Sequence, residues 1–96
     1  MSAHFATISG SLGLRDETLI PFSRGWVAPN AEEVLAVIKF LGLTQARAAA
    51  LLGVNPRTFR RWVLGEVLIS YSSWRLLLVY AEIADSKNDL DFVKTS

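Results

Sequence analysis

The stretch "LTQARAAALLGVNPRTFRRW", residues 43–62, holds two short helix-forming segments separated by a glycine. Thr44 is suited to cap the first helix because its side-chain oxygen can accept a bond from a free backbone N–H, and the alanine-rich residues that follow favour a helix. Gly53 predicts the end of this helix. Asn55 and Pro56 predict the start of the next, since proline at the first helical position loses no hydrogen bond.

The second segment is amphipathic. Phe59, Trp62 and Val63 recur at steps of three and four residues, which predicts that they form its buried side. The residues expected to point outward or to flank that outer face are Pro56, Arg57, Arg60, Arg61 and Leu64. The segment is therefore expected to expose a basic face.

Two helices joined by so few residues can pack at a steep angle only if the residues at the corner are small. Ala49 is expected to face this corner, Gly53 to supply the turn conformation and Val54 to fill the space beneath. The other apolar residues that would hold the pair against its neighbours are Ala48, Leu52, Phe59 and Trp62. The pattern predicts a helix-turn-helix.

A helix is expected on the N-terminal side, in "PNAEEVLAVIKFLG", residues 29–42. Asn30 can cap it, and Glu33 stands in the position of a capping box, so Glu32 and Glu33 are interpreted as capping acids rather than a catalytic pair. Gly42 predicts its end. The expected apolar stripe consists of Val34, Leu35, Ile38 and Leu41.

A last helix is expected in "SYSSWRLLLVYAEIA", residues 70–84, after Gly65 ends the preceding one. Ser70 or Ser72 would cap it. Its expected buried side consists of Trp74, Leu77, Leu78, Ala81 and Ile83. The prediction is a compact all-α fold of four to five helices, with residues 30–84 as the helix-turn-helix domain and 85–96 as a C-terminal tail.

Residues 1–29 are punctuated by glycine and proline, which predicts an irregular N-terminal arm that is partly ordered. Within it "ETLIPF", residues 17–22, is expected to form a short strand, and His4 to be a tail residue. The apolar residues of the arm are Leu19, Ile20, Phe22, Trp26 and Val27. Because these are too many for a free tail, residues 18–29 are expected to pack on the domain or on a second subunit.

The residue content excludes several kinds of chemistry. The 96 residues include no cysteine and a single histidine, His4, which removes disulfides, cysteine nucleophiles and the common metal sites. Without a cluster of nucleophile, base or metal ligands, neither an enzyme nor a bound cofactor is expected. Apolar runs such as Leu76 to Ala81 are far shorter than the roughly 20 residues of a membrane span, so we expect a cytoplasmic protein without a membrane partner.

The net charge of +1 conceals an uneven distribution of charge. No acid lies between Glu33 and Glu66, and this interval contains five cations: Lys39, Arg47, Arg57, Arg60 and Arg61. Such asymmetry can orient a protein toward a polyanion, although charge alone is equally compatible with a solvated basic face.

Taken whole, "LGLTQARAAALLGVNPRTFRRWVLGE", residues 41–66, resembles the helix-turn-helix of the lambda-repressor and Cro-like (XRE-type) family. With the flanking helices the resemblance covers residues 31–84. It implies a lambda-repressor-like DNA-binding domain of a bacterial, phage or plasmid transcription regulator. Such regulators are usually homodimeric repressors that bind a palindromic operator in double-stranded DNA.

The resemblance and the residue chemistry suggest how bases would be read. Arg57, Thr58 and Arg61 match the base-reading positions of the family, and arginine can bind guanine O6 and N7 in a bidentate manner worth about 1 to 3 kcal/mol of discrimination. Pro56 replaces a polar base-reading residue of many relatives and is expected against a thymine methyl group.

Further positions are expected to hold phosphates. Thr44 and Gln45 match family positions at the N-terminus of the second helix, where free N–H groups favour an anion. The other candidates are Arg47, Asn55, Arg60, Ser70, Tyr71 and Ser72. The loop "GEVLIS", residues 65–70, lacks the lysine or arginine that often adds phosphate affinity in this family.

Two alternatives remain open at this point. A helix-turn-helix can instead bind a partner protein, as in an antitoxin or a component of a phage or plasmid nucleoprotein complex, with the apolar arm as the contact surface. An excisionase-like winged helix-turn-helix would also suit "NPRTFRRW", residues 55–62, but it requires a β-hairpin where residues 70–84 predict a helix.

Overall fold

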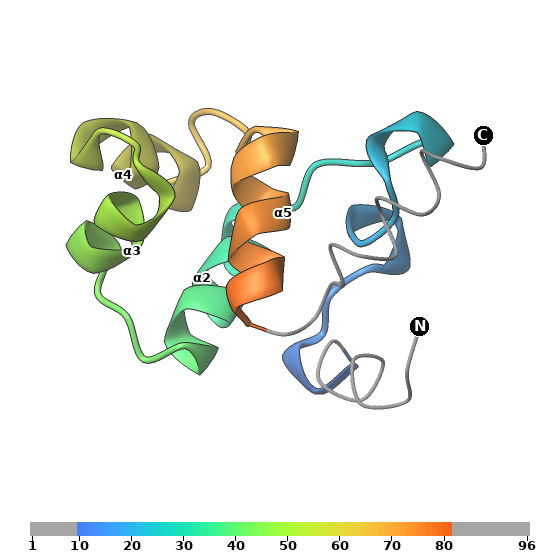
Figure 1. Ribbon diagram of the computed structural model, residues 1–96, viewed down its shortest axis with the longest axis horizontal. Coiled ribbons are helices and arrows are strands. Elements are labelled where there is room, and N and C mark those ends of the chain that lie inside the picture. The colour runs from blue at the N-terminus through green and yellow to red at the C-terminus, as the bar shows by residue number, and fades with distance from the viewer. Residues whose placement is uncertain (1–9, 82–96) are drawn as a thin grey trace.

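A computed structural model describes residues 10–81, and all regular structure in that range is helical (Figure 1). Residues 10–12 are helical, and two 3₁₀ turns follow, η1 (Asp16–Thr18) and η2 (Phe22–Arg24). The four α-helices described in full are α2 (Ala31–Phe40), α3 (Gln45–Leu52), α4 (Pro56–Val63) and α5 (Tyr71–Tyr80). The predicted all-α fold is confirmed for this part of the chain.

Each of these four helices begins at a side chain expected to cap it. Asn30, Thr44, Asn55 and Ser70 each accept a hydrogen bond from a backbone N–H of the first turn, at 2.8 to 3.3 Å. At α2 the capping box is complete, because the Glu33 side chain also accepts from the backbone N–H of Asn30. Local hydrogen-bond chemistry therefore sets where the helices start.

The core lies where α2, α3, α4 and α5 meet. Trp74, Leu77 and Leu78 of α5 are fully buried. The other helical residues of this core are Val34, Val37, Ile38, Ala48, Ala49, Phe59, Trp62 and Val63. Ala81, expected on the buried side of the last helix, is buried as well, while Ile83 and the tail 85–96 lie outside the described residues.

The expected apolar stripe of α2 is wrong at one position. Val37 is completely buried, whereas Leu35 is 37% exposed. The buried residues follow the steps of three and four from Val34 through Val37 and Ile38 to Leu41, and Leu35 lies beside that stripe. So many apolar residues in one short helix allow two overlapping stripes, and only the packing partners decide between them.

The expected strand in residues 17–22 is also wrong. Thr18 ends η1, and the amide of Leu19 donates to the carbonyl of Asp16 at 2.9 Å. Pro21 has no N–H to give to a sheet, and its carbonyl accepts from Arg24 N at 2.9 Å within η2. The backbone groups that a strand would need are thus used in local turns.

The arm is nevertheless part of the core. Thr18 is fully buried, and its carbonyl oxygen accepts from the indole nitrogens of Trp26 at 3.0 Å and Trp74 at 2.7 Å. The guanidinium of Arg75, a buried residue of α5, donates to the carbonyl of Leu19. These bonds fasten the arm to α5, so residues 18–26 pack on the domain of their own chain.

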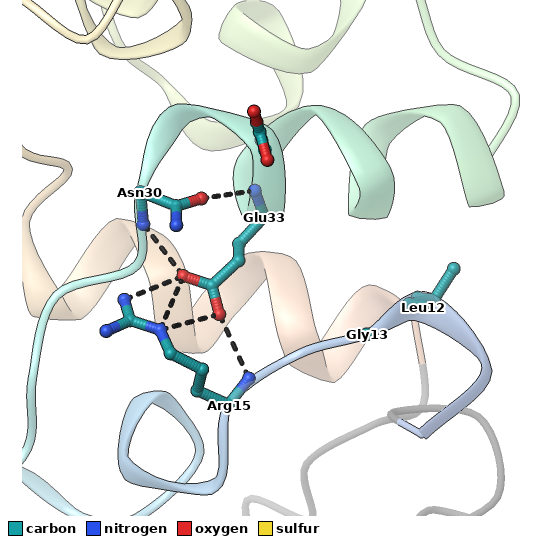
Figure 2. A pocket seen from close by; sticks show the side chains of 6 residues that line it. Leu12, Gly13, Arg15, Asn30 and Glu33 are labelled. Carbon is teal, nitrogen blue, oxygen red and sulfur yellow. Dashed lines mark hydrogen bonds and ion pairs between the residues drawn. The ribbon is translucent and has the colours of Figure 1, made fainter.

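An ion pair that sequence reasoning missed joins the arm to α2 (Figure 2). Glu33 is 6% exposed, and its carboxylate accepts from Arg15 Nη2 at 2.8 Å and from the backbone N–H of Arg15 at 3.0 Å. Burial raises the pKa of Glu33, but the hydrogen bonds from Arg15 and Asn30 outweigh it and hold the pKa below its ordinary value. The carboxylate is therefore charged at neutral pH, and both of its oxygens accept hydrogen bonds.

Within residues 10–81, no single helix is long and apolar enough to cross a membrane. Helices α2 and α3 are long and apolar enough only when taken together, and the chain bends by 91° at the break between them.

Candidate nucleic-acid interface

The corner between α3 and α4 has the tight geometry that the sequence predicts. Gly53 adopts the left-handed conformation with φ 70°, and the amide of Val54 donates back to the carbonyl of Ala49 at 3.0 Å. Ala48 and Ala49 are fully buried, which lets the two helices approach closely. The predicted helix-turn-helix arrangement is present.

The buried side of α4 fixes the direction of its outer side. Phe59 is fully buried and Trp62 is 6% exposed, and their rings meet edge to face with centroids 5.7 Å apart. Trp62 and Trp74 are thus core residues, as expected. The residues on the outer side of α4, together with Leu64 just after its end, are exposed. They are Pro56, Arg57, Thr58, Arg60, Arg61 and Leu64.

A shallow hollow joins the start of α3 to the outer face of α4. Its volume is about 330 Å³, and it is lined by Gln45, Ala46, Pro56, Arg57 and Arg60. The structure thereby brings an expected phosphate-binding residue of α3 onto one continuous surface with expected base-reading residues of α4.

A second hollow flanks the start of α3 on its other side. Thr44 and Gln45 line it together with Lys39 of α2, and exposed Leu35 forms part of its apolar wall. The Thr44 oxygen accepts from the Arg47 amide at 3.1 Å, which leaves the hydroxyl hydrogen available to donate to an anion. Lys39 was not among the expected site residues, although the acid-free interval that contains it was a signal.

The start of α5 differs from expectation in one respect. Ser70 and Ser72 are exposed, but the ring of Tyr71 is half-buried against Trp26, at 5.0 Å between centroids, and Phe22, at 5.4 Å. These three residues line neither hollow described above. The Tyr71 ring holds the arm on α5, a contact that no local pattern in the sequence indicated.

Charge on the outer face of α4 is unevenly compensated. Arg61 Nε lies 3.6 Å from Glu66 Oε2, whereas among residues 10–81 neither Arg57 nor Arg60 forms an ion pair. Arg57 and Arg60 therefore keep their full positive charge on this face, whereas the charge of Arg61 is partly neutralised.

The chain is similar to two curated proteins from Escherichia coli, each named transcriptional repressor protein KorC. The first is 42% identical over 77 residues, which cover 77% of this chain and 89% of the relative. The second is 39% identical over 75 residues, covering 75% and 87%. The chain belongs to the KorC family of transcriptional repressors.

The KorC relatives are transcriptional repressors and not enzymes, in agreement with the expectation from the residue content. No protein-family model matches the chain, and no solved structure matches it. The winged helix-turn-helix alternative is excluded because the residues after α4 form α5 instead of a β-hairpin.

Proposed function

We propose that the protein is a repressor that binds specific sequences of double-stranded DNA by placing α4 in the major groove, in the manner of lambda-repressor and Cro-like proteins. The observation that carries this proposal is the two-sided character of α4. Phe59 and Trp62 anchor one side in the core, while Arg57 and Arg61 stand exposed one turn apart on the other. An anchored helix with exposed arginines suits readout of guanine.

The hollows on either side of Gln45 support a division of roles. Arg57, Thr58 and Arg61 would contact base edges, with Pro56 against a thymine methyl group. The residues that line the two hollows and would hold phosphates are Lys39, Thr44, Gln45 and Arg60. Outside the hollows, the further candidates for phosphate contacts are Arg47, Asn55, Ser70, Tyr71 and Ser72. Such contacts set the register of the protein on DNA without reading sequence.

A homodimer on a palindromic operator is the assembly that this role favours. One α4 offers few base contacts, and proteins of this kind gain specificity from two half-sites about one helical turn apart. Leu76 and Tyr80 of α5, 38% and 47% exposed, are available for contact with a second copy. A repressor that acts on DNA in a bacterial cell would work in the cytoplasm, and this is the location that we propose.

The roles of the arginines are tested by substitution. Arg57→Ala or Arg61→Ala should abolish the preference for an operator over a scrambled duplex, because each removes a contact to bases. Arg47→Ala should weaken binding to both duplexes and reduce the slope of log K against log salt by about one, because it removes a phosphate contact. Fluorescence anisotropy over a range of salt concentrations measures both quantities.

Equal losses on the operator and the scrambled duplex for all three variants would remove the base-reading assignment. Circular dichroism of each variant would confirm that it is folded, as expected for substitutions at exposed positions.

A protein-binding role is the second candidate, and exposed apolar side chains on the arm favour it. Phe22 is 65% exposed and Val27 is 44% exposed. Deleting the arm would not test this role cleanly, because Thr18 belongs to the core. Val27→Ser is suitable instead, because the Phe22 ring also contacts Tyr71 and Val27 does not share this aromatic contact. Loss of a co-purifying partner with DNA binding unchanged would favour this second role.

A further inference from the structure

The Arg61–Glu66 pair lies at one end of the proposed reading face. Glu66 is the first acid after Glu33 along the chain, and it lies next to one of the three arginines of α4. Arg57, one turn earlier on the same face, has no acidic partner among the described residues. The two proposed base-reading arginines are therefore not equivalent in the unbound protein.

The backbone holds Glu66 in this place. After α4 ends, Gly65 takes a left-handed conformation with φ 76°, which reverses the chain. The amides of Glu66 and Val67 then both donate to the carbonyl oxygen of Arg61, at 3.0 and 3.4 Å. These two hydrogen bonds thus fix the backbone of Glu66 relative to the backbone of Arg61.

The pair is open to solvent and easily exchanged. Both side chains are 56% exposed, and Nε and Oε2 are 3.6 Å apart, longer than a good hydrogen bond. Exposed pairs of this kind are weak, so a better partner can displace the carboxylate. A guanine edge offers Arg61 two acceptors in one plane, whereas a phosphate near Glu66 would meet the repulsion of its charge.

We propose that Glu66 is a specificity-determining residue that acts through Arg61. Its carboxylate holds the guanidinium away from the phosphates of unrelated DNA and releases it when a guanine edge is presented. This inference rests on the proposed function, since it requires that Arg61 face DNA bases.

The test compares affinities for an operator, obtained as the duplex enriched from a random pool, and for a scrambled duplex of the same composition. Glu66→Gln keeps the shape of the side chain and removes its charge. We expect it to tighten binding to the scrambled duplex by about two- to fivefold, the size expected for an exposed ion pair. Binding to the operator should tighten less, so the specificity ratio should fall.

A double-mutant cycle distinguishes an effect of Glu66 through Arg61 from a general effect of its charge. In the Arg61→Ala background, Glu66→Gln should no longer tighten binding to the scrambled duplex, because the residue through which Glu66 acts is gone. Glu17→Gln is the matched control. Glu17 is also an exposed acid next to an arginine, 3.8 Å from Arg15 Nε, but it lies on the arm, and its substitution should leave the ratio unchanged.

Three outcomes overturn the inference. An unchanged specificity ratio in Glu66→Gln would show that the pair has no role in selection. Tightening of the scrambled-duplex affinity by the same factor with and without Arg61 would show that Glu66 acts only as a general charge. If the unsubstituted protein prefers no duplex at all, the proposed function fails, and the inference with it.

Discussion

At the scale of single residues, Glu33 performs two tasks with one carboxylate. It completes the capping box of α2 through Asn30, and it pairs with Arg15 of the arm. Hydrogen bonds to a charged group contribute more than neutral ones, and a buried carboxylate without them would be costly. Glu33 therefore couples the start of α2 to the docking of the arm.

The low pKa of Glu33 predicts how stability depends on pH. The folded state binds this proton less readily than the unfolded state, so the contribution is complete above the ordinary glutamate pKa of about 4.3 and is lost as pH falls through the lower folded pKa. Glu33→Gln should reduce the free energy of unfolding at pH 7 by about 1.5 to 3 kcal/mol and flatten the acid limb. Urea unfolding at several pH values measures both.

Glu32→Gln is the control for that experiment, because Glu32 lies in the same first turn but is exposed. Its substitution should change stability by less than about 0.5 kcal/mol. If Glu33→Gln and Glu32→Gln gave the same pH profile, the special role of the buried pair would be refuted.

At the scale of the elements, Gly53 determines whether α3 and α4 can form their corner. A Cβ at this position would meet no atom within 4 Å, so the requirement for glycine comes from its φ of 70° and not from crowding. Gly53→Ala should therefore cost about 1 to 2 kcal/mol, the strain of a left-handed residue, and Gly53→Asn should cost less.

Thermal or urea unfolding of these variants tests the origin of the requirement. Gly10→Ala serves as control, because Gly10 is helical, has no positive φ and also has open space around it. This control should be neutral or slightly stabilising. A Gly53→Ala variant as stable as Gly10→Ala would show that the corner does not require a residue with a positive φ.

The elements also show what could be predicted from sequence. Caps at Asn30, Thr44, Asn55 and Ser70 depend on residues two or three positions away, so local chemistry is enough to place them. The buried face of α2 depends on which helices pack against it, and for that reason Leu35 was misassigned.

Contacts between residues far apart in the sequence could not be predicted from local patterns. Arg75 meets the carbonyl of Leu19 across 56 positions, and Arg15 meets Glu33 across 18. No periodicity signals either contact. At the candidate site, the exposure of Arg57 and Arg61 followed from the burial of Phe59, but the approach of Glu66 to Arg61 depends on the turn at Gly65.

At the scale of the whole molecule, the arm and the helices form one packed body. The arm contributes Leu14 and Thr18 to the interior, and the carbonyl of Thr18 joins Trp26 to Trp74. Helix α4 packs against α2 and α3 within this body. The proposed reading face is thus held by the core, as positioning of side chains on base edges would require.

We propose that two copies of this chain read a palindrome through α4 of each copy. Selection of bound duplexes from a random pool, followed by measurement of the protein-to-DNA stoichiometry, tests it most directly. We expect enrichment of a two-fold symmetric sequence, with half-sites about one helical turn apart, bound by two chains. Failure to enrich any sequence at low salt would contradict it.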